Sequence, residues 1–384
     1  MFSMRKKFLI LTLGLFAALL LSGCTGSTVW PGLAADGKTA YLANTTAIHA
    51  LDLQTGQELW KFSVSGGFLN SNPSIFVTTP LLTEDGLLII PDSGNKHVIY
   101  ALDTKDINAE EKTPAVAWQF SGATGHWIAS PLIVGDRLFA PNSDGKVYVL
   151  DLTDGQSEKQ AIKVIDLPDT VQQPGRLWAQ PVTDGQRLFV TSLDHSLFAI
   201  DLNTYEILWH EDLGGAIPGA PVIGADGMLY VGSLAKQFEK FDPATGQHES
   251  VVETQGWVWG TPVVAGDNIY FSDIAGYLYS YNTGTGRLNW DPIQLDATAS
   301  GNAITASPLL LGDRVLVAVE SGDVYAVGAD GDVKLWHQGP DKGKLYTTPV
   351  QAGDYLLVAY IESDYYLIAL DKDGDKKWTY PAGK

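Results

Sequence analysis

Two short motifs in this 384-residue sequence contain residue types that could catalyse a reaction or hold a metal ion. Residues 194–196 read Asp-His-Ser, which suggests a nucleophilic triad, but triads are assembled from distant segments and not from neighbours at a strand start. Residues 371–375 begin like a calcium loop, yet the glycine stands at the fourth position instead of the sixth and Ala382 occupies the acidic twelfth. We therefore expect a hairpin turn at residues 371–375 and no triad at residues 194–196.

The remaining polar residues show no spacing that is typical of catalysis or metal binding. The histidines lie in different parts of the chain, and we expect surface or turn positions for His49, His97, His126, His195, His210, His248 and His337. The sequence also lacks a nucleophile elbow, a Walker loop and a Rossmann fingerprint. We predict no catalytic residues, no metal site and no cofactor.

The only cysteine, Cys24, follows a sequence that is typical of a secretion signal. Three basic residues at positions 5–7 precede an apolar run at residues 8–21, which is shorter than the roughly 20 residues that span a bilayer. The run ends in Leu-Ser-Gly-Cys, which resembles the bacterial lipobox. We expect a signal peptide at residues 1–23, lipidation of Cys24, a tether at residues 24–27 and an extracytoplasmic, membrane-anchored protein. The alternative is an ordinary signal peptide followed by an incidental cysteine.

The composition indicates a globular, acidic protein. The chain is 45% hydrophobic, with 40 Gly, 19 Pro and 11 Trp, and its net charge is -19. Removal of the leader would leave 22 basic against 44 acidic residues. Such a charge disfavours binding to nucleic acid or to anionic lipid headgroups. Many of the aspartates stand in Asp-Gly or Gly-Asp pairs, so much of the acidity is explained by tight turns.

A repeat accounts for almost the whole mature chain. A proline, a few apolar residues, a Gly/Asp turn and β-rich runs recur in eight units that begin at Pro31, Pro80, Pro131, Pro181, Pro221, Pro262, Pro308 and Pro349. Four short strands in each unit predict an all-β fold, an eight-bladed β-propeller of four-stranded antiparallel blades over residues 28–384. An array of β-sandwiches is the competing architecture, but it would not explain a proline at one place in every unit.

The last segment of each unit carries the most regular signal. Asp52 and Trp60 have the same spacing as Asp201 and Trp209 and as Asn282 and Trp290, and weaker copies end at Trp118, Trp336 and Trp378. The third and fifth units lack the tryptophan. We expect the outer-strand rings to pack between neighbouring blades as structural residues: Trp60, Trp209, Trp290, Trp336 and Trp378.

A second group of tryptophans could serve binding. The residues just before the repeated prolines are small, as expected of innermost strands at a crowded axis, and four rings lie slightly upstream: Trp127, Trp178, Trp257 and Trp259. These rings could form an aromatic rim at one mouth of the channel and stack a ligand or an extended peptide. The alternative is that each of them packs between blades.

The motif Ala/Ile-Asp-x-x-Thr-Gly-x-x-x-Trp with a downstream Pro and Gly-Asp resembles the PQQ-like propeller repeat. Together with the lipobox and eight repeats, the chain resembles the BamB family of lipoproteins of the outer-membrane β-barrel assembly machinery. The resemblance implies a monomeric, non-catalytic scaffold that binds the barrel-inserting subunit, on the periplasmic face of the outer membrane, or on the outer face of the cytoplasmic membrane if the host has no outer membrane. That family carries a Leu-Arg-containing contact loop, and the nearest stretch here, residues 213–221, has no arginine.

Quinoprotein dehydrogenases share the repeat and define the alternative, a propeller that binds a small ligand or a quinone cofactor. They are generally larger, use a Ca²⁺ site, and many of the alcohol-oxidising members carry an adjacent cysteine pair. One cysteine cannot supply that pair.

Overall fold

The computed structural model describes residues 30–64, 73–168, 177–296 and 302–381. Cys24 and the expected signal peptide lie outside these ranges. Every regular element within them is a β-strand. No helix in the described residues is long and apolar enough to cross a membrane.

The strands form eight sheets in chain order. Blade 1 is β1 (Gly32–Ala35), β2 (Thr39–Asn44), β3 (Ala47–Asp52) and β4 (Glu58–Phe62); blade 2 is β5 (Leu81–Leu82), β6 (Leu87–Pro91), β7 (Ile99–Asn108) and β8 (Thr113–Phe120). Blade 3 is β9 (Leu132–Val134), β10 (Arg137–Pro141), β11 (Lys146–Asp151) and β12 (Ala161–Asp166); blade 4 is β13 (Val182–Thr183), β14 (Arg187–Thr191), β15 (Ser196–Asp201) and β16 (Ile207–Asp212).

The second half repeats the arrangement. Blade 5 is β17 (Val222–Ile223), β18 (Leu229–Gly232), β19 (Gln237–Phe241) and β20 (His248–Glu253); blade 6 is β21 (Val263–Ala265), β22 (Asn268–Ser272), β23 (Tyr277–Asn282), β24 (Arg287–Leu288) and β25 (Ile293–Gln294). Blade 7 is β26 (Leu309–Leu311), β27 (Arg314–Ala318), β28 (Val324–Gly328) and β29 (Val333–His337); blade 8 is β30 (Val350–Ala352), β31 (Tyr355–Ala359), β32 (Leu367–Leu370) and β33 (Lys376–Tyr380).

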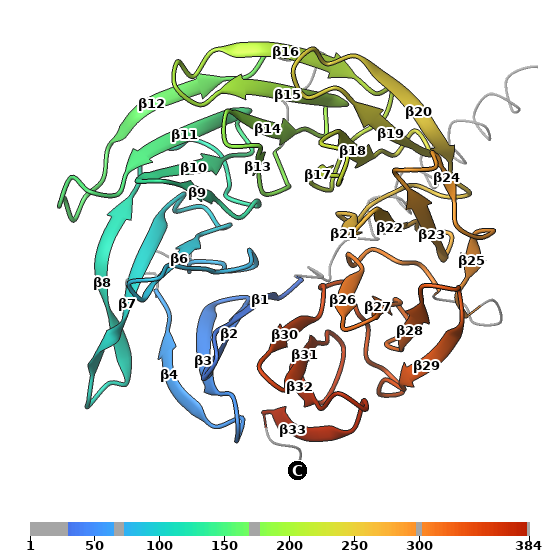
Figure 1. Cartoon of the computed structure of the whole chain (residues 1–384). Helices are drawn as coiled ribbons and strands as arrows, with labels where there is room; N and C mark the ends of the chain where they lie inside the picture. The colour runs from blue at the N-terminus through green and yellow to red at the C-terminus, as the bar shows by residue number, and fades with distance from the viewer. Residues whose placement is uncertain (1–29, 65–72, 169–176, 297–301, 382–384) are drawn as a thin grey trace, which may run out of the picture.

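The blades stand in a ring around a central opening, with the first strand of each blade innermost (Figure 1). Consecutive strands pair antiparallel, which confirms the predicted eight-bladed propeller. Blade 6 differs, because its outer strand is divided into β24 and β25, which both pair with β23. Pro292 lies in the interruption and has no N–H to donate to the sheet.

The hydrophobic core consists of eight clusters, one at each interface between neighbouring blades. At the interface of blades 1 and 2, for example, Tyr41 and Trp60 of blade 1 pack with Leu88 and Tyr100 of blade 2. The last cluster joins blade 8 to blade 1 and closes the ring. Each sheet therefore packs against a neighbouring blade on both of its faces.

The five outer-strand tryptophans lie at these interfaces. Trp60 and Trp378 are buried, and Trp209, Trp290 and Trp336 are half-buried against their clusters. The indole N–H of Trp378 donates to the Leu53 carbonyl in blade 1 (2.8 Å), and that of Trp209 donates to the Pro243 carbonyl in blade 5 (3.1 Å). Each of these two rings thus packs on the outer turn of the next blade.

Candidate functional site

The Asp-His-Ser motif at residues 194–196 forms the turn between β14 and β15. Asp194 Oδ1 accepts a hydrogen bond from the backbone N–H of Ser196 (3.2 Å), and His195 Nδ1 lies 3.8 Å from Asp212 Oδ1. Asp194 therefore organises its own turn, as a turn carboxylate commonly does.

Residues 371–375 form the turn between β32 and β33, as predicted. Asp371 Oδ1 accepts hydrogen bonds from the backbone N–H groups of Asp373 and Asp375, both at 3.0 Å, and its other oxygen lies 2.6 Å from Lys377 Nζ. These contacts hold the pKa of Asp371 at about 2. In the part of the chain that the structure describes, no three His, Cys, Asp or Glu side chains are placed to hold a metal ion.

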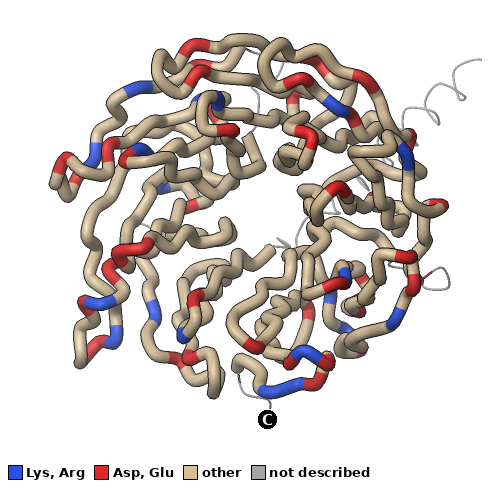
Figure 2. Tube along the Cα trace, in the orientation of Figure 1, with Lys and Arg blue, Asp and Glu red and all other residues tan. Residues whose placement is uncertain are grey.

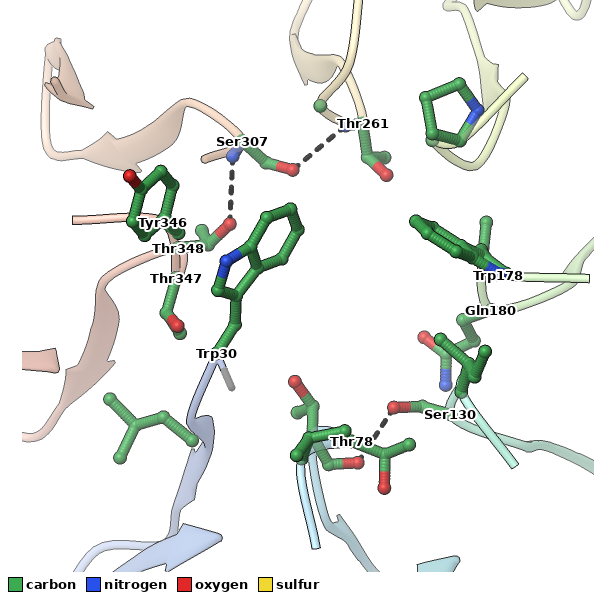
Figure 3. Close-up of a pocket in the computed structure, with 18 of the residues that line it drawn as sticks. Trp30, Thr78, Ser130, Trp178, Gln180, Thr261, Ser307, Tyr346, Thr347 and Thr348 are labelled. Atoms are coloured by element: carbon green, nitrogen blue, oxygen red, sulfur yellow. Dashed lines mark hydrogen bonds between the residues drawn. The ribbon is translucent and has the colours of Figure 1, made fainter. Parts of the chain in front are cut away.

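A cavity of about 550 Å³ lies on the axis of the ring, where the loops enter the innermost strands (Figure 3). The residue three positions before the repeated proline lines it in blades 2 to 8: Val77, Ile128, Trp178, Pro218, Trp259, Thr305 and Tyr346. One position of the repeat therefore contributes a lining residue in each of these seven blades. This position brings together two of the four predicted rim residues, Trp178 and Trp259.

Trp127 does not line this cavity, which corrects the expectation for that residue. It stands four positions before its proline, and the residues at that position are all fully buried: Phe76, Trp127, Leu177, Ile217, Val258, Ile304 and Leu345. Its ring packs against Phe120 and Tyr148 between blades 2 and 3. Successive side chains of an extended segment point to opposite sides, so one step in register moves a ring from the axis to the core.

Trp257 lies outside the cavity lining as well. Its side chain is 45% exposed, and its carbonyl accepts the N–H of Ile274 (3.0 Å) in the turn between β22 and β23. Trp257 is therefore close to Trp259 in sequence, but it lies on the surface and not in the cavity lining.

Four aromatic rings form a continuous series across the cavity. Tyr346 stacks on Trp30 with a centroid separation of 5.3 Å, Trp30 meets Trp259 edge-on at 6.0 Å, and Trp259 meets Trp178 edge-on at 6.3 Å. In Figure 3, Trp30 and Trp178 stand on opposite sides of the cavity. Sequence reasoning missed Trp30 and Tyr346, although Tyr346 shares the register of Trp178 and Trp259.

Small polar residues tie the innermost segments of neighbouring blades together around the cavity. The Ser307 N–H donates to Thr348 Oγ1 (2.9 Å), the Thr261 N–H donates to Ser307 Oγ (2.9 Å), and the Ala220 N–H donates to Thr261 Oγ1 (3.0 Å). The segments approach closely: a Cβ added at Gly219 would lie 2.7 Å from the Gly260 carbonyl oxygen. The small residues predicted at the axis are thus required by this spacing.

The described lining contains no charged side chain. Figure 2 likewise shows few charged residues on the segments that border the central opening. Behind the lining, Glu320 Oε1 accepts the Tyr346 hydroxyl (2.8 Å) and lies 3.0 Å from Lys344 Nζ. Burial and the hydrogen bond to Glu320 raise the pKa of Tyr346, so that its hydroxyl stays protonated.

Two polar atoms of the lining have no hydrogen-bond partner among the residues that the structure describes. They are the indole Nε1 of Trp178 and the hydroxyl oxygen of Thr305, and both atoms are buried. A buried donor without an acceptor is unusual, because the free energy lost on removing it from water is not recovered.

The lining can also be tested against pyrroloquinoline quinone, the cofactor that the repeat implies. Its flat rings could stack on Trp30 or Trp178, but its carboxylates would find no cation among the described lining residues. The residues present therefore do not fit this cofactor, and we derive no redox step from it.

Comparison with known proteins gives a family match. The profile described as "Outer membrane protein assembly factor BamB" matches residues 21–248 and 296–384. A relative described by the same name, from Moranella endobia, is 23% identical over 307 residues, which cover 77% of this chain and 71% of the relative.

Two further matches bear on the fold. The crystal structure of BamB from Moraxella catarrhalis superposes with a TM-score of 0.63 at 19% identity, covering 87% of this chain and 91% of that chain, which supports the fold alone. A lanthanide-dependent methanol dehydrogenase from Methylacidiphilum fumariolicum is 31% identical over 160 residues, but these cover only 37% of this chain and 26% of that enzyme.

Proposed function

The chain belongs to the family of outer membrane protein assembly factor BamB, and we propose on that premise that it is a lipid-anchored, non-catalytic scaffold that binds the β-barrel assembly machinery. The observation that carries this proposal is the family match over both halves of the propeller, at residues 21–248 and 296–384. The motifs that could have indicated catalysis form ordinary turns, which agrees with a binding role.

The proposed anchor is Cys24, which stands six residues before Trp30, the first described residue. Six residues of extended chain span at most about 21 Å. Because Trp30 lies in the axial cavity, a lipid on Cys24 would hold the cavity side of the ring close to the membrane. The proposed location is the periplasmic face of the outer membrane.

The partner surface lies elsewhere than in residues 213–221. Ile217 and Ala220 in this segment are buried, and Pro218 faces the axial cavity. A segment enclosed in this way offers little surface to another protein. We therefore place partner contact on the exposed loops and outer strands.

The proposal is tested by mild cross-linking in native membranes, purification of the full-length protein and mass spectrometry of the proteins bound to it. We expect near-stoichiometric recovery of a β-barrel assembly subunit. In a parallel strain, Cys24→Ser should release the protein from the membrane fraction. Recovery of no envelope protein with the lipidated form would overturn the scaffold role, and membrane retention of Cys24→Ser would overturn the anchor.

A further inference from the structure

We propose that the axial cavity is a binding site for an uncharged saccharide. The proposal goes beyond the scaffold role, because it concerns the axis of the ring and not the surface that would contact a partner protein. It rests on the aromatic rings, the charge and the unpartnered polar atoms of the cavity.

The aromatic rings give the cavity stacking surfaces on several blades. Trp30, Trp178, Trp259 and Tyr346 come from blades 1, 4, 6 and 8, so only the closed ring brings them together. The C–H faces of sugar rings are apolar and pack on indole faces, while their hydroxyls remain free to form hydrogen bonds. An aliphatic ligand would use the rings but not the polar atoms between them.

The charge of the cavity selects against ions. The described lining has no charged side chain, although the whole chain carries a net charge of -19. A carboxylate or an ammonium group would lose its hydration in this cavity without gaining an ionic partner. An uncharged polyhydroxyl ligand avoids that loss.

Two buried polar atoms at the cavity wall have no hydrogen-bond partner among the described residues. The Trp178 N–H can only donate, and the Thr305 hydroxyl can donate and accept. Rotation of either side chain toward the cavity would let a ring or hydroxyl oxygen of a saccharide bind it. The Gln180 side chain, also in the lining, is exposed and donates to the Pro131 carbonyl (2.8 Å), which leaves its amide oxygen available.

The size of the cavity agrees with an oligosaccharide of a few rings. Its volume of about 550 Å³ lies within the range of about 300 to 1,000 Å³ that small-molecule sites occupy.

The test is calorimetric titration of the lipidated chain, purified in a detergent without a sugar headgroup. The probes are cellobiose, maltose and N,N′-diacetylchitobiose, each to about 10 mM. A disaccharide that contains glucuronic acid serves as the charged comparison. We expect binding of at least one uncharged probe and none of the charged one.

Three variants locate the site. Trp259→Ala should weaken binding by about tenfold or more. Trp178→Phe keeps a ring but removes the N–H, and it should weaken binding by about threefold to tenfold. Trp257→Ala removes the exposed neighbouring tryptophan and should leave binding unchanged.

Four results would overturn the proposal. The first three are failure of all three uncharged probes to bind, equal loss of binding in Trp257→Ala and Trp259→Ala, and preference for the charged disaccharide. The fourth is binding of an uncharged, aromatic-rich peptide in place of the saccharides. Recovery of membrane partners by Trp259→Ala, measured alongside, separates failure of this site from failure of the scaffold role.

Discussion

Single glycines determine how closely a tryptophan can pack on the next blade. A Cβ added at Gly246 would lie 2.9 Å from the ring of Trp209, and one added at Gly56 would lie 2.6 Å from the ring of Trp378. Gly246 also has a φ of 76°, in the left-handed region. The Thr-Gly of the repeat therefore combines a turn requirement with a packing requirement.

These two requirements can be separated with a matched pair in blade 5. Gly227 has a φ of 75° but nothing lies within 4 Å of an added Cβ. Gly227→Ala should cost about 1–2 kcal/mol of unfolding free energy, from backbone strain alone. Gly246→Ala should cost a further 1–3 kcal/mol or so, because the new methyl group overpacks Trp209. Urea denaturation measures both, and equal losses in the two variants would show that the ring contact contributes nothing.

The residue scale is also where the sequence predicted least. The proline repeat located the inner strands, but it did not show which of two consecutive positions faces the axis. Trp127 and Trp178 both precede a proline closely, yet they differ by one register step and lie in the core and in the cavity respectively. An alignment of units 2 to 8 supplies part of the missing information, because the residues at the position of Trp127 are apolar in all seven of these units.

At the scale of elements, an inserted loop of blade 3 extends the outer strand of blade 2. The Gln119 N–H of β8 donates to the Ser157 carbonyl (2.8 Å), and the Lys159 N–H donates to the Gln119 carbonyl (2.7 Å). Lys159 is only 2% exposed, forms an ion pair with Asp154 and lies 5.8 Å from the centroid of the Trp118 ring. The loop thus covers an edge strand with a buried charge.

Removing either member of this ion pair should have unequal effects. Asp154→Asn leaves the buried Lys159 ammonium without a charged partner and should cost about 1–3 kcal/mol. Lys159→Met keeps most of the packing and should cost less than about 1.5 kcal/mol, because the Asp154 side chain is 28% exposed and can reach water. Thermal or urea unfolding of the two variants decides the order, and a larger loss in Lys159→Met would contradict this account.

Strand order was predictable, whereas strand continuity was not. Alternating apolar residues and turn glycines define four strands per unit, and the structure has them in that order. The outer strand of blade 6 is divided at Pro292. A proline interrupts a strand where its position would have to donate an N–H to the adjacent strand. That information arises only when β23 is in place.

At the scale of the whole molecule, the ring closes without exchange of a strand between the first and last blades. Blade 1 contains β1 to β4 and blade 8 contains β30 to β33, so each of these blades is built from consecutive strands. Closure therefore depends on side chains: Trp378 packs with Leu51 and Leu53 of blade 1 in the closing cluster.

Trp378→Ala should therefore be among the most destabilising single changes in the outer strands. Truncating a buried aromatic ring costs about 3–5 kcal/mol, and here the hydrogen bond to the Leu53 carbonyl is lost as well. The matched control is Trp257→Ala, an exposed tryptophan, which should change the free energy of unfolding by less than about 0.5 kcal/mol. Equal unfolding midpoints for the two variants would show that closure does not depend on this ring.

A polar contact at the same closure makes stability sensitive to acid. Glu58 Oε2 accepts the hydroxyl of Tyr380 and lies 2.6 Å from His49 Nδ1, so blade 8 and blade 1 share one carboxylate. Burial lowers the pKa of His49 despite the opposing effect of Glu58, and nearby Lys61 lowers it further. The folded ring therefore favours neutral His49, with its Nδ1–H tautomer donating to Glu58.

The sign of the pH effect follows from this lowered pKa. Below about pH 6.5 the unfolded chain binds a proton at His49 before the folded chain does, so stability is present above that pH and is lost as pH falls through the folded pKa. His49→Gln should flatten the fall in urea midpoint between about pH 7.5 and 5.5. His337, whose pKa burial also lowers, contributes a second part of the same slope that His49→Gln leaves in place. His49 contacts Tyr380 across the interface of blades 8 and 1. An unchanged pH dependence of the urea midpoint in His49→Gln would therefore mean that acid destabilises the propeller at another interface between blades.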